Sequence, residues 1–132
     1  MNMLEKFQSE LEDDTKIDEI NLLEKQMMLP AIKHKWVARL ITFKRELNKL
    51  NKQKKELKES VLQNLQEKGI PPGMPKSILD KKIETSSPIV KIQEEIEDIE
   101  IIILYLEKVE TILKTMTYDM KNIVDITKME TT

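Results

Sequence analysis

The stretch LPAIKHKWVARLITFKRELNKLNKQKKELKESVLQNLQE, residues 29–67, decides the fold because its apolar residues recur at spacings of three and four. That spacing predicts one long helix with a heptad seam. Lys54 stands at a seam position where leucine is expected, and it either fixes the helix register or extends its amine out of the seam. The predicted seam residues are Trp36, Leu40, Phe43, Leu47, Leu50, Leu57 and Val61.

The same stretch carries a large excess of positive charge. Residues 33–58 contain eight lysines and two arginines but only two glutamates, a net charge of +8, whereas the whole chain has a net charge of −2. Solvated helix faces usually intersperse acids among their lysines, so this excess favours a surface that binds an anion. The basic side chains that avoid the seam form two adjacent lines: Lys44, Lys55 and Lys58 in one, and Arg45, Lys49 and Lys52 in the other.

Nucleic acid is the favoured partner of these basic lines. Lysine and arginine neutralise phosphates, and Asn48 and Asn51 lie between the cations as further hydrogen-bond donors. The near absence of aromatic residues on the lines predicts sequence-tolerant, salt-sensitive binding. An acidic protein, including acidic segments of this chain, is the second interpretation. A membrane surface is a weaker one, because the apolar seam is narrow for an interfacial helix.

The rest of the chain predicts further helices. Short helical pieces are expected within residues 1–28, with Pro30 marking a kink or junction before the long basic helix of residues 29–68. Gly69 is its expected C-cap, and residues 69–87 form a proline-rich connector that has room for a short helix from Lys76 to Glu84.

A second long helix is expected over residues 88–128. Ser86 or Ser87 would cap it, with Pro88 in its first turn. Its apolar face is too broad for one partner helix, and residues 94–110 carry a net charge of −6. Because one chain of this size cannot cover such a face, residues 88–128 are the predicted oligomerisation helix.

These patterns together predict an all-α protein. Residues 1–132 would form a single domain of two long antiparallel helices plus short N-terminal helices, assembled into a homo-oligomer. The chain has no cysteine, His34 is its only histidine, and no phosphate-binding or nucleophile motif occurs, so no enzyme, metal site or cofactor is expected. The longest apolar run, residues 101–106, is too short for a membrane helix, and a cytoplasmic protein is expected.

Several landmarks occur in an order and spacing that are similar to a known family. They are Leu4 to Leu11, Ile17-Asp18, Lys35-Trp36, Lys44-Arg45-Glu46, Gln53-Lys54-Lys55, Gly69 and Tyr118-x-Met120-Lys121-x-Ile123-x-Asp125. With these landmarks the chain resembles the UvsY recombination mediators of T-even-like bacteriophages. The resemblance implies a ring-like helical homo-oligomer, a hexamer or heptamer, that binds single-stranded DNA in the infected bacterial host. It also implies that the protein helps a RecA-like, UvsX-type recombinase displace the phage single-strand-binding protein.

One departure from the family falls at the end of the basic stretch. The family carries L-K-A-R-L there, whereas this chain has Leu57-Lys58-Glu59-Ser60-Val61. The lysine is kept as Lys58, the arginine is missing and Glu59 adds an opposing charge. The predicted nucleic-acid-binding residues are therefore Lys44, Arg45, Lys49, Lys52, Lys55 and Lys58.

Two other functions fit the same residues. In the first, the protein is a structural coiled-coil adaptor whose basic helix binds an acidic partner, which includes the acidic helix of a neighbouring copy. In the second, it binds RNA, because a surface that reads phosphates discriminates weakly between the two nucleic acids.

Overall fold

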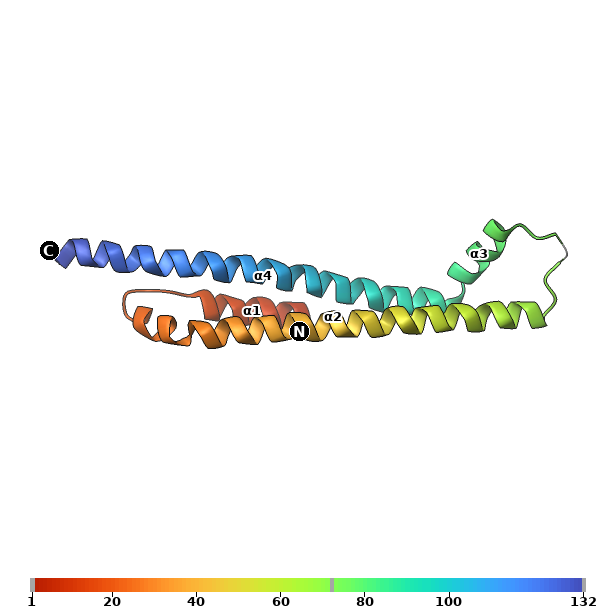
Figure 1. Cartoon of the computed structure of the whole chain (residues 1–132), viewed down its shortest axis with the longest axis horizontal. Coiled ribbons are helices and arrows are strands. Elements are labelled where there is room, and N and C mark those ends of the chain that lie inside the picture. Colours follow the sequence, from red (N-terminus) through yellow and green to blue (C-terminus); the bar gives the residue numbers. More distant parts are fainter. Residues whose placement is uncertain (1, 72, 132) are drawn as a thin grey trace. The chain divides into compact units, whose positions relative to one another are not determined.

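The computed structural model describes residues 2–71 and 73–131, and these ranges contain four helices and no strand (Figure 1). The helices are α1 (Met3–Thr15), α2 (Leu22–Glu67), α3 (Lys76–Glu84) and α4 (Ser87–Thr131). The predicted all-α class with two long helices is confirmed. The chain divides into two compact units, one of Met1–Thr42 with Ile102–Thr132 and the other of Phe43–Ile101, and each long helix contributes to both.

The start of α2 differs from the expectation. The short helical piece predicted before residue 29 is continuous with the long helix, which begins at Leu22 and passes through Pro30. Proline inside a helix removes one hydrogen bond and costs about 3 kcal/mol. Leu29 and Ile32 on either side of it are buried, and their packing offsets that cost. In the turn before the helix, the Asp18 carboxylate accepts from the amides of residues 20 and 21.

In the first unit, α1 and the α2 segment up to Thr42 pack with the α4 segment from Ile102. One groove there is lined by Leu29 with Met120 and another by Trp36 with Leu113, so the two long segments run antiparallel. The buried apolar residues of this unit are Phe7, Leu11, Leu29, Ile32, Trp36, Leu40, Ile103, Leu106, Val109, Leu113, Met116 and Met120. The predicted packing role of Trp36 is confirmed, because only 1% of its surface is exposed.

A cluster of charges fastens α1 to α2. The Arg39 guanidinium donates to both carboxylate oxygens of Glu10, at 2.6 and 3.1 Å. Lys35 Nζ and Trp36 Nε1 both donate to Asp14 Oδ2, at 2.5 and 2.9 Å. The Arg39 side chain also stacks over the Trp36 ring, 4.7 Å from its centroid. Two of the cations in the basic stretch are therefore neutralised by α1.

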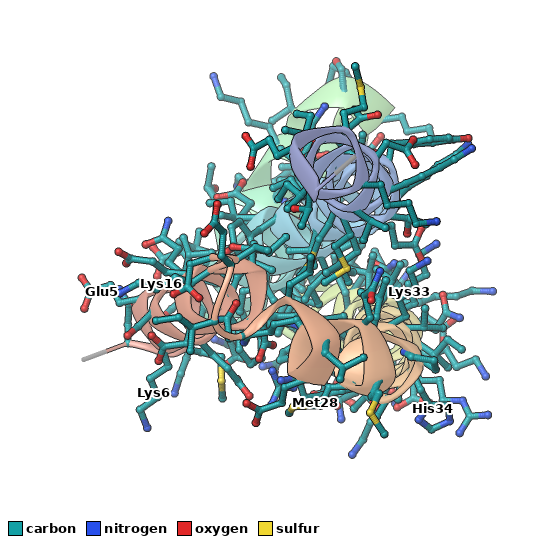
Figure 2. All side chains as sticks on the ribbon, turned by 90° about the vertical axis from the view of Figure 1, so that its left-hand side faces the viewer. Glu5, Lys6, Lys16, Met28, Lys33 and His34 are labelled. Carbon is teal, nitrogen blue, oxygen red and sulfur yellow. The ribbon has the colours of Figure 1, made fainter. Side chains whose placement is uncertain are left out.

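The side chains of Lys33 and His34, just before Lys35 on α2, point in different directions (Figure 2). Lys33 extends to α4, where its Nζ donates to Thr117 Oγ1 at 2.9 Å. His34 is exposed and points outward, as expected of an ordinary surface residue.

In the second unit, α2 from Phe43, the short helix α3 and α4 up to Ile101 pack together. Their core cluster consists of Leu50, Ile92 and Ile96, with Leu47, Leu57 and Ile99 partly buried around it. Lys54, at the predicted seam position, is half-buried and its Nζ donates across to Gln93 Oε1 at 2.6 Å. The amine therefore has a partner on α4.

The turns of this unit follow the predictions. Helix α2 ends at Glu67 and Gly69 has a φ of 82°, the left-handed conformation of a glycine C-cap. Helix α3 occupies Lys76–Glu84 as predicted, while Pro72 of the connector lies outside the described residues. Helix α4 begins at Ser87, and the Ser86 carbonyl accepts from the amides of residues 89 and 90. It continues beyond the predicted end at Lys128, to Thr131.

The charge cluster between α1 and α2 predicts a pH-dependent stability. Hydrogen bonds from Arg39, with a smaller contribution from Lys35, lower the pKa of Glu10 from its ordinary value of 4.5, partly offset by burial. A lowered folded-state pKa means that this stabilisation is present above pH 4.5 and is lost as the pH falls through the folded-state value. The Glu10 side chain is 37% exposed, so solvent screening limits the effect to about 1 kcal/mol.

We therefore expect Glu10→Gln to lower the free energy of urea unfolding at neutral pH, and the difference from wild type to shrink at about pH 4. Circular dichroism at both pH values measures it. Glu12→Gln, a change at an exposed position of the same helix, serves as control and should leave both values close to wild type. A loss for Glu10→Gln that is equal at both pH values would contradict the assignment.

Candidate nucleic-acid interface

The predicted binding residues all lie on the part of α2 that belongs to the second unit. Lys44, Arg45, Lys49, Lys52 and Lys55 are exposed, and Lys58 is half-buried. We call these six residues the basic face. From its first to its last member the helix rises about 21 Å, at 1.5 Å per residue. Because one rigid helix carries all six, their spacing along its axis is fixed.

The other four cations of the basic stretch make contacts with α1 or α4. Lys35 and Arg39 pair with carboxylates of α1, while Lys33 and Lys54 donate to uncharged oxygens of α4.

The basic face presents cations without aromatic side chains. Phe43, the nearest aromatic residue, is half-buried on the seam, and Trp36 is buried in the other unit. Asn48 and Asn51 are exposed between the cations. Such a surface can neutralise backbone phosphates and donate hydrogen bonds to them, but it offers no platform for base stacking.

Comparison with known proteins places this arrangement in a family. The family described as "Recombination, repair and ssDNA binding protein UvsY" matches residues 10–132. The chain belongs to the UvsY family. The family's description names recombination, repair and binding of single-stranded DNA and does not name a catalysed reaction.

Solved structures show the same fold. Three crystal forms of the bacteriophage T4 recombination mediator protein UvsY match the chain with TM-scores of 0.85, 0.84 and 0.82. Their sequence identities are 18%, 19% and 20%; the matches cover 98%, 95% and 100% of this chain and 99%, 98% and 99% of the T4 chains. A comparison with curated protein sequences gives no match.

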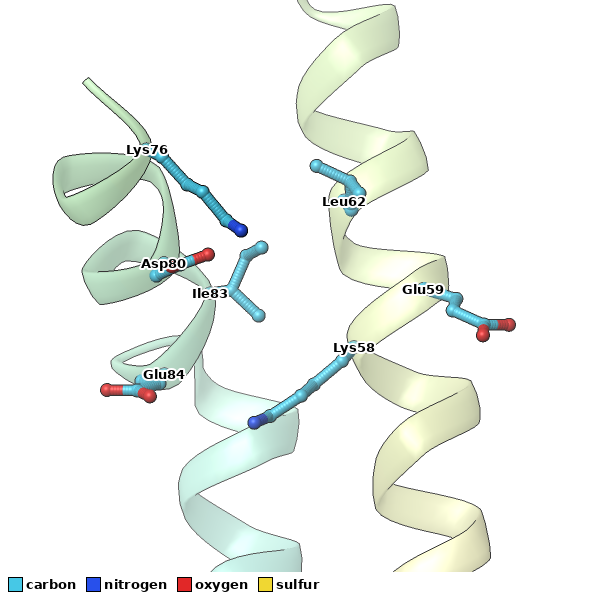
Figure 3. A pocket seen from close by; sticks show the side chains of 7 residues that line it. All are labelled: Lys58, Glu59, Leu62, Lys76, Asp80, Ile83 and Glu84. Carbon is cyan, nitrogen blue, oxygen red and sulfur yellow. The ribbon is translucent and has the colours of Figure 1, made fainter. Parts of the chain in front are cut away.

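The position where this chain departs from the UvsY family pattern lies beside α3. Lys58 and Glu59 line a groove between α2 and α3 with a volume of about 400 Å³ (Figure 3). Two acidic residues of α3, Asp80 and Glu84, line the same groove. Periodicity within α2 could not reveal these neighbours, because the connector between the two helices decides which side of α3 faces α2.

Other kinds of site are not formed by the residues described. Within residues 2–71 and 73–131, no three side chains of His, Cys, Asp or Glu come together as metal ligands. In the same part of the chain no helix is both long and apolar enough to cross a bilayer.

Proposed function

We propose that this UvsY-family chain is a recombination mediator. Its basic face binds single-stranded DNA without sequence preference, and the bound assembly loads a RecA-like, UvsX-type recombinase while displacing the phage single-strand-binding protein. The observation that carries the proposal is the division of the ten cations of α2. Four of them contact α1 or α4, whereas the six on the basic face, five of them exposed, lie along one helix that the packing seam holds in place.

The chemistry of the basic face supports backbone recognition. Lysine and arginine side chains on a helix neutralise phosphates of any sequence, and counterion release makes such binding depend steeply on salt. Specific reading of bases would need stacking or convergent hydrogen-bond groups, which the face lacks. A mediator acts on strands of many sequences, and a phosphate-reading surface suits that task.

Exposed apolar residues support assembly into a homo-oligomer. On the α4 segment of the first unit, Leu104 is 57% exposed, Tyr118 63%, Ile126 55% and Met129 77%. Leaving these side chains in water is unfavourable, and neighbouring copies would cover them. We propose the hexamer or heptamer that the family resemblance implies. Several basic faces on one strand would then act together through a high effective concentration.

Replacing Lys49, Lys52 and Lys55 together by alanine should weaken binding to single-stranded DNA at least tenfold, because each phosphate that is no longer neutralised keeps its condensed counterions. The salt dependence should also fall, with a log–log slope smaller by about 0.7 for each such phosphate. Fluorescence anisotropy of a labelled oligothymidylate over a salt series measures both quantities.

The matched control removes three lysines of α4, Lys108, Lys114 and Lys121, which changes the net charge equally. It should retain most of the affinity. Salt-independent binding, or equal loss for both triple variants, would contradict the basic face as the site. If the variant of α2 instead dissociates the oligomer and the wild type binds no DNA, the coiled-coil adaptor is the correct interpretation.

Assembly should depend on the exposed apolar side chains of α4. Ile126→Glu places a charge among them, and we expect a smaller native mass in analytical ultracentrifugation because burying an unpaired carboxylate is costly. Ile20→Glu is the control, because Ile20 is 96% exposed and lies in the turn before α2. A wild-type chain that stays monomeric with and without DNA would contradict the proposed oligomer.

The loading activity is tested on DNA already covered by the phage single-strand-binding protein. Adding the wild-type chain should shorten the lag before a RecA-like recombinase forms filaments, followed by the fluorescence of a labelled strand. The triple variant of the basic face should leave the lag unchanged, because it cannot engage the strand. A wild-type chain that binds the strand but never shortens the lag would contradict the mediator function while leaving the DNA binding intact.

A further inference from the structure

The groove between α2 and α3 has a charge that differs from that of the rest of the basic face. Its lining residues are Lys58, Glu59, Leu62, Lys76, Asp80, Ile83 and Glu84. Lys58 and Lys76 contribute two amines, and Asp80 and Glu84 of α3 contribute two carboxylates, so the groove does not share the net positive charge of the basic face. The basic face nevertheless includes Lys58 as its last member. At that position the surface proposed to attract phosphates meets two acids of α3.

Figure 3 shows how the charged side chains lie. Lys58 extends from α2 toward the C-terminal end of α3, where Glu84 lies, whereas Glu59 points away from α3. Among the ion pairs of the described residues, none joins Lys58 to Asp80 or Glu84 within 4.0 Å. The three side chains share the groove without a close ion pair, and opposite charges interact at longer range only within the Debye length of about 10 Å at 0.1 M salt.

Helix α3 is held mainly at its C-terminal end. It has nine residues, Ile83 is its buried side chain, and its N-cap, Pro75, makes no side-chain hydrogen bond. The segment before it contains Gly69 and Gly73, both with positive φ and both with open space around the position of a Cβ. A short helix with so little buried surface opens at low free energy. When α3 opens, its carboxylates move away from Lys58, and another anion can then bind the Lys58 amine.

We infer that Asp80 and Glu84 of α3 compete with DNA phosphates for Lys58. In the free protein these carboxylates hold the amine in the groove, and a bound strand draws it onto the basic face. The inference rests on the proposed DNA binding by that face and goes further, because it assigns α3 the role of setting the affinity. Phosphate is favoured as the incoming anion because the neighbouring Lys55 is exposed on the same helical line.

The test neutralises the competing carboxylates with isosteric amides. Combining Asp80→Asn with Glu84→Gln should tighten binding to a short oligothymidylate by about twofold to fivefold, the range of an exposed charge pair. In a Lys58→Gln background the same two changes should give a smaller gain. The dependence on Lys58 separates competition for that amine from a general change of protein charge. Circular dichroism of each variant checks that the helices are kept.

The matched control is Glu94→Gln with Asp98→Asn on α4. These residues are exposed, have the same spacing and lie outside the groove, so any gain should be the same with and without Lys58. A gain for the α3 variant that does not depend on Lys58, or no gain, would overturn the inference while the wild type still binds. A wild type that binds no DNA would overturn the proposed function and this inference together.

Discussion

The packing of one face of α2 against α4 is the constraint on which the rest depends. In the first unit it buries Trp36, and in the second it buries Leu50 against Ile92 and Ile96. Since a helix turns 100° per residue, fixing the seam fixes the direction of every other side chain. The exposed cations therefore share one surface because the apolar residues share another.

That constraint explains why the basic stretch divides as it does. Lys54 falls on the seam and has to reach Gln93 to be satisfied, and Lys35 and Arg39 fall beside α1 and meet its carboxylates. A charge that is half removed from water needs a partner, since desolvation disfavours it. Five of the six cations on the basic face are exposed, and exposed cations can attract phosphates at long range and exchange counterions for them.

Local patterns were enough to predict much of the fold. The heptad spacing of α2, the glycine at residue 69 and the serine–proline start of α4 each act within a few residues, and each is found as predicted. The long helix begins at Leu22, before the expected boundary at residue 29, because propensity rules assign a cost to Pro30 but not the burial of Leu29 and Ile32 that offsets it.

The partners across the fold could not be predicted in the same way. Arg39 and Glu10 are 29 residues apart, and Lys54 and Gln93 are 39 apart. No periodicity within one helix links such pairs. Sequence therefore could not show which partners Arg39 and Lys54 have, and nothing in it indicated that α3 brings two acids to the groove beside Lys58.

Lys58 shows how a family pattern and a particular chain can differ in physical terms. The family resemblance keeps this lysine, but the arginine that would follow it is absent and Glu59 stands next to it. The groove adds two acids of α3 to the same neighbourhood. The electrostatic potential at this end of the basic face is consequently lowered, whereas Arg45, Lys49 and Lys52 lie more than one helical turn before Lys58 along α2. If the basic face binds DNA as proposed, the strongest attraction for a phosphate backbone would therefore shift toward the N-terminal part of the face.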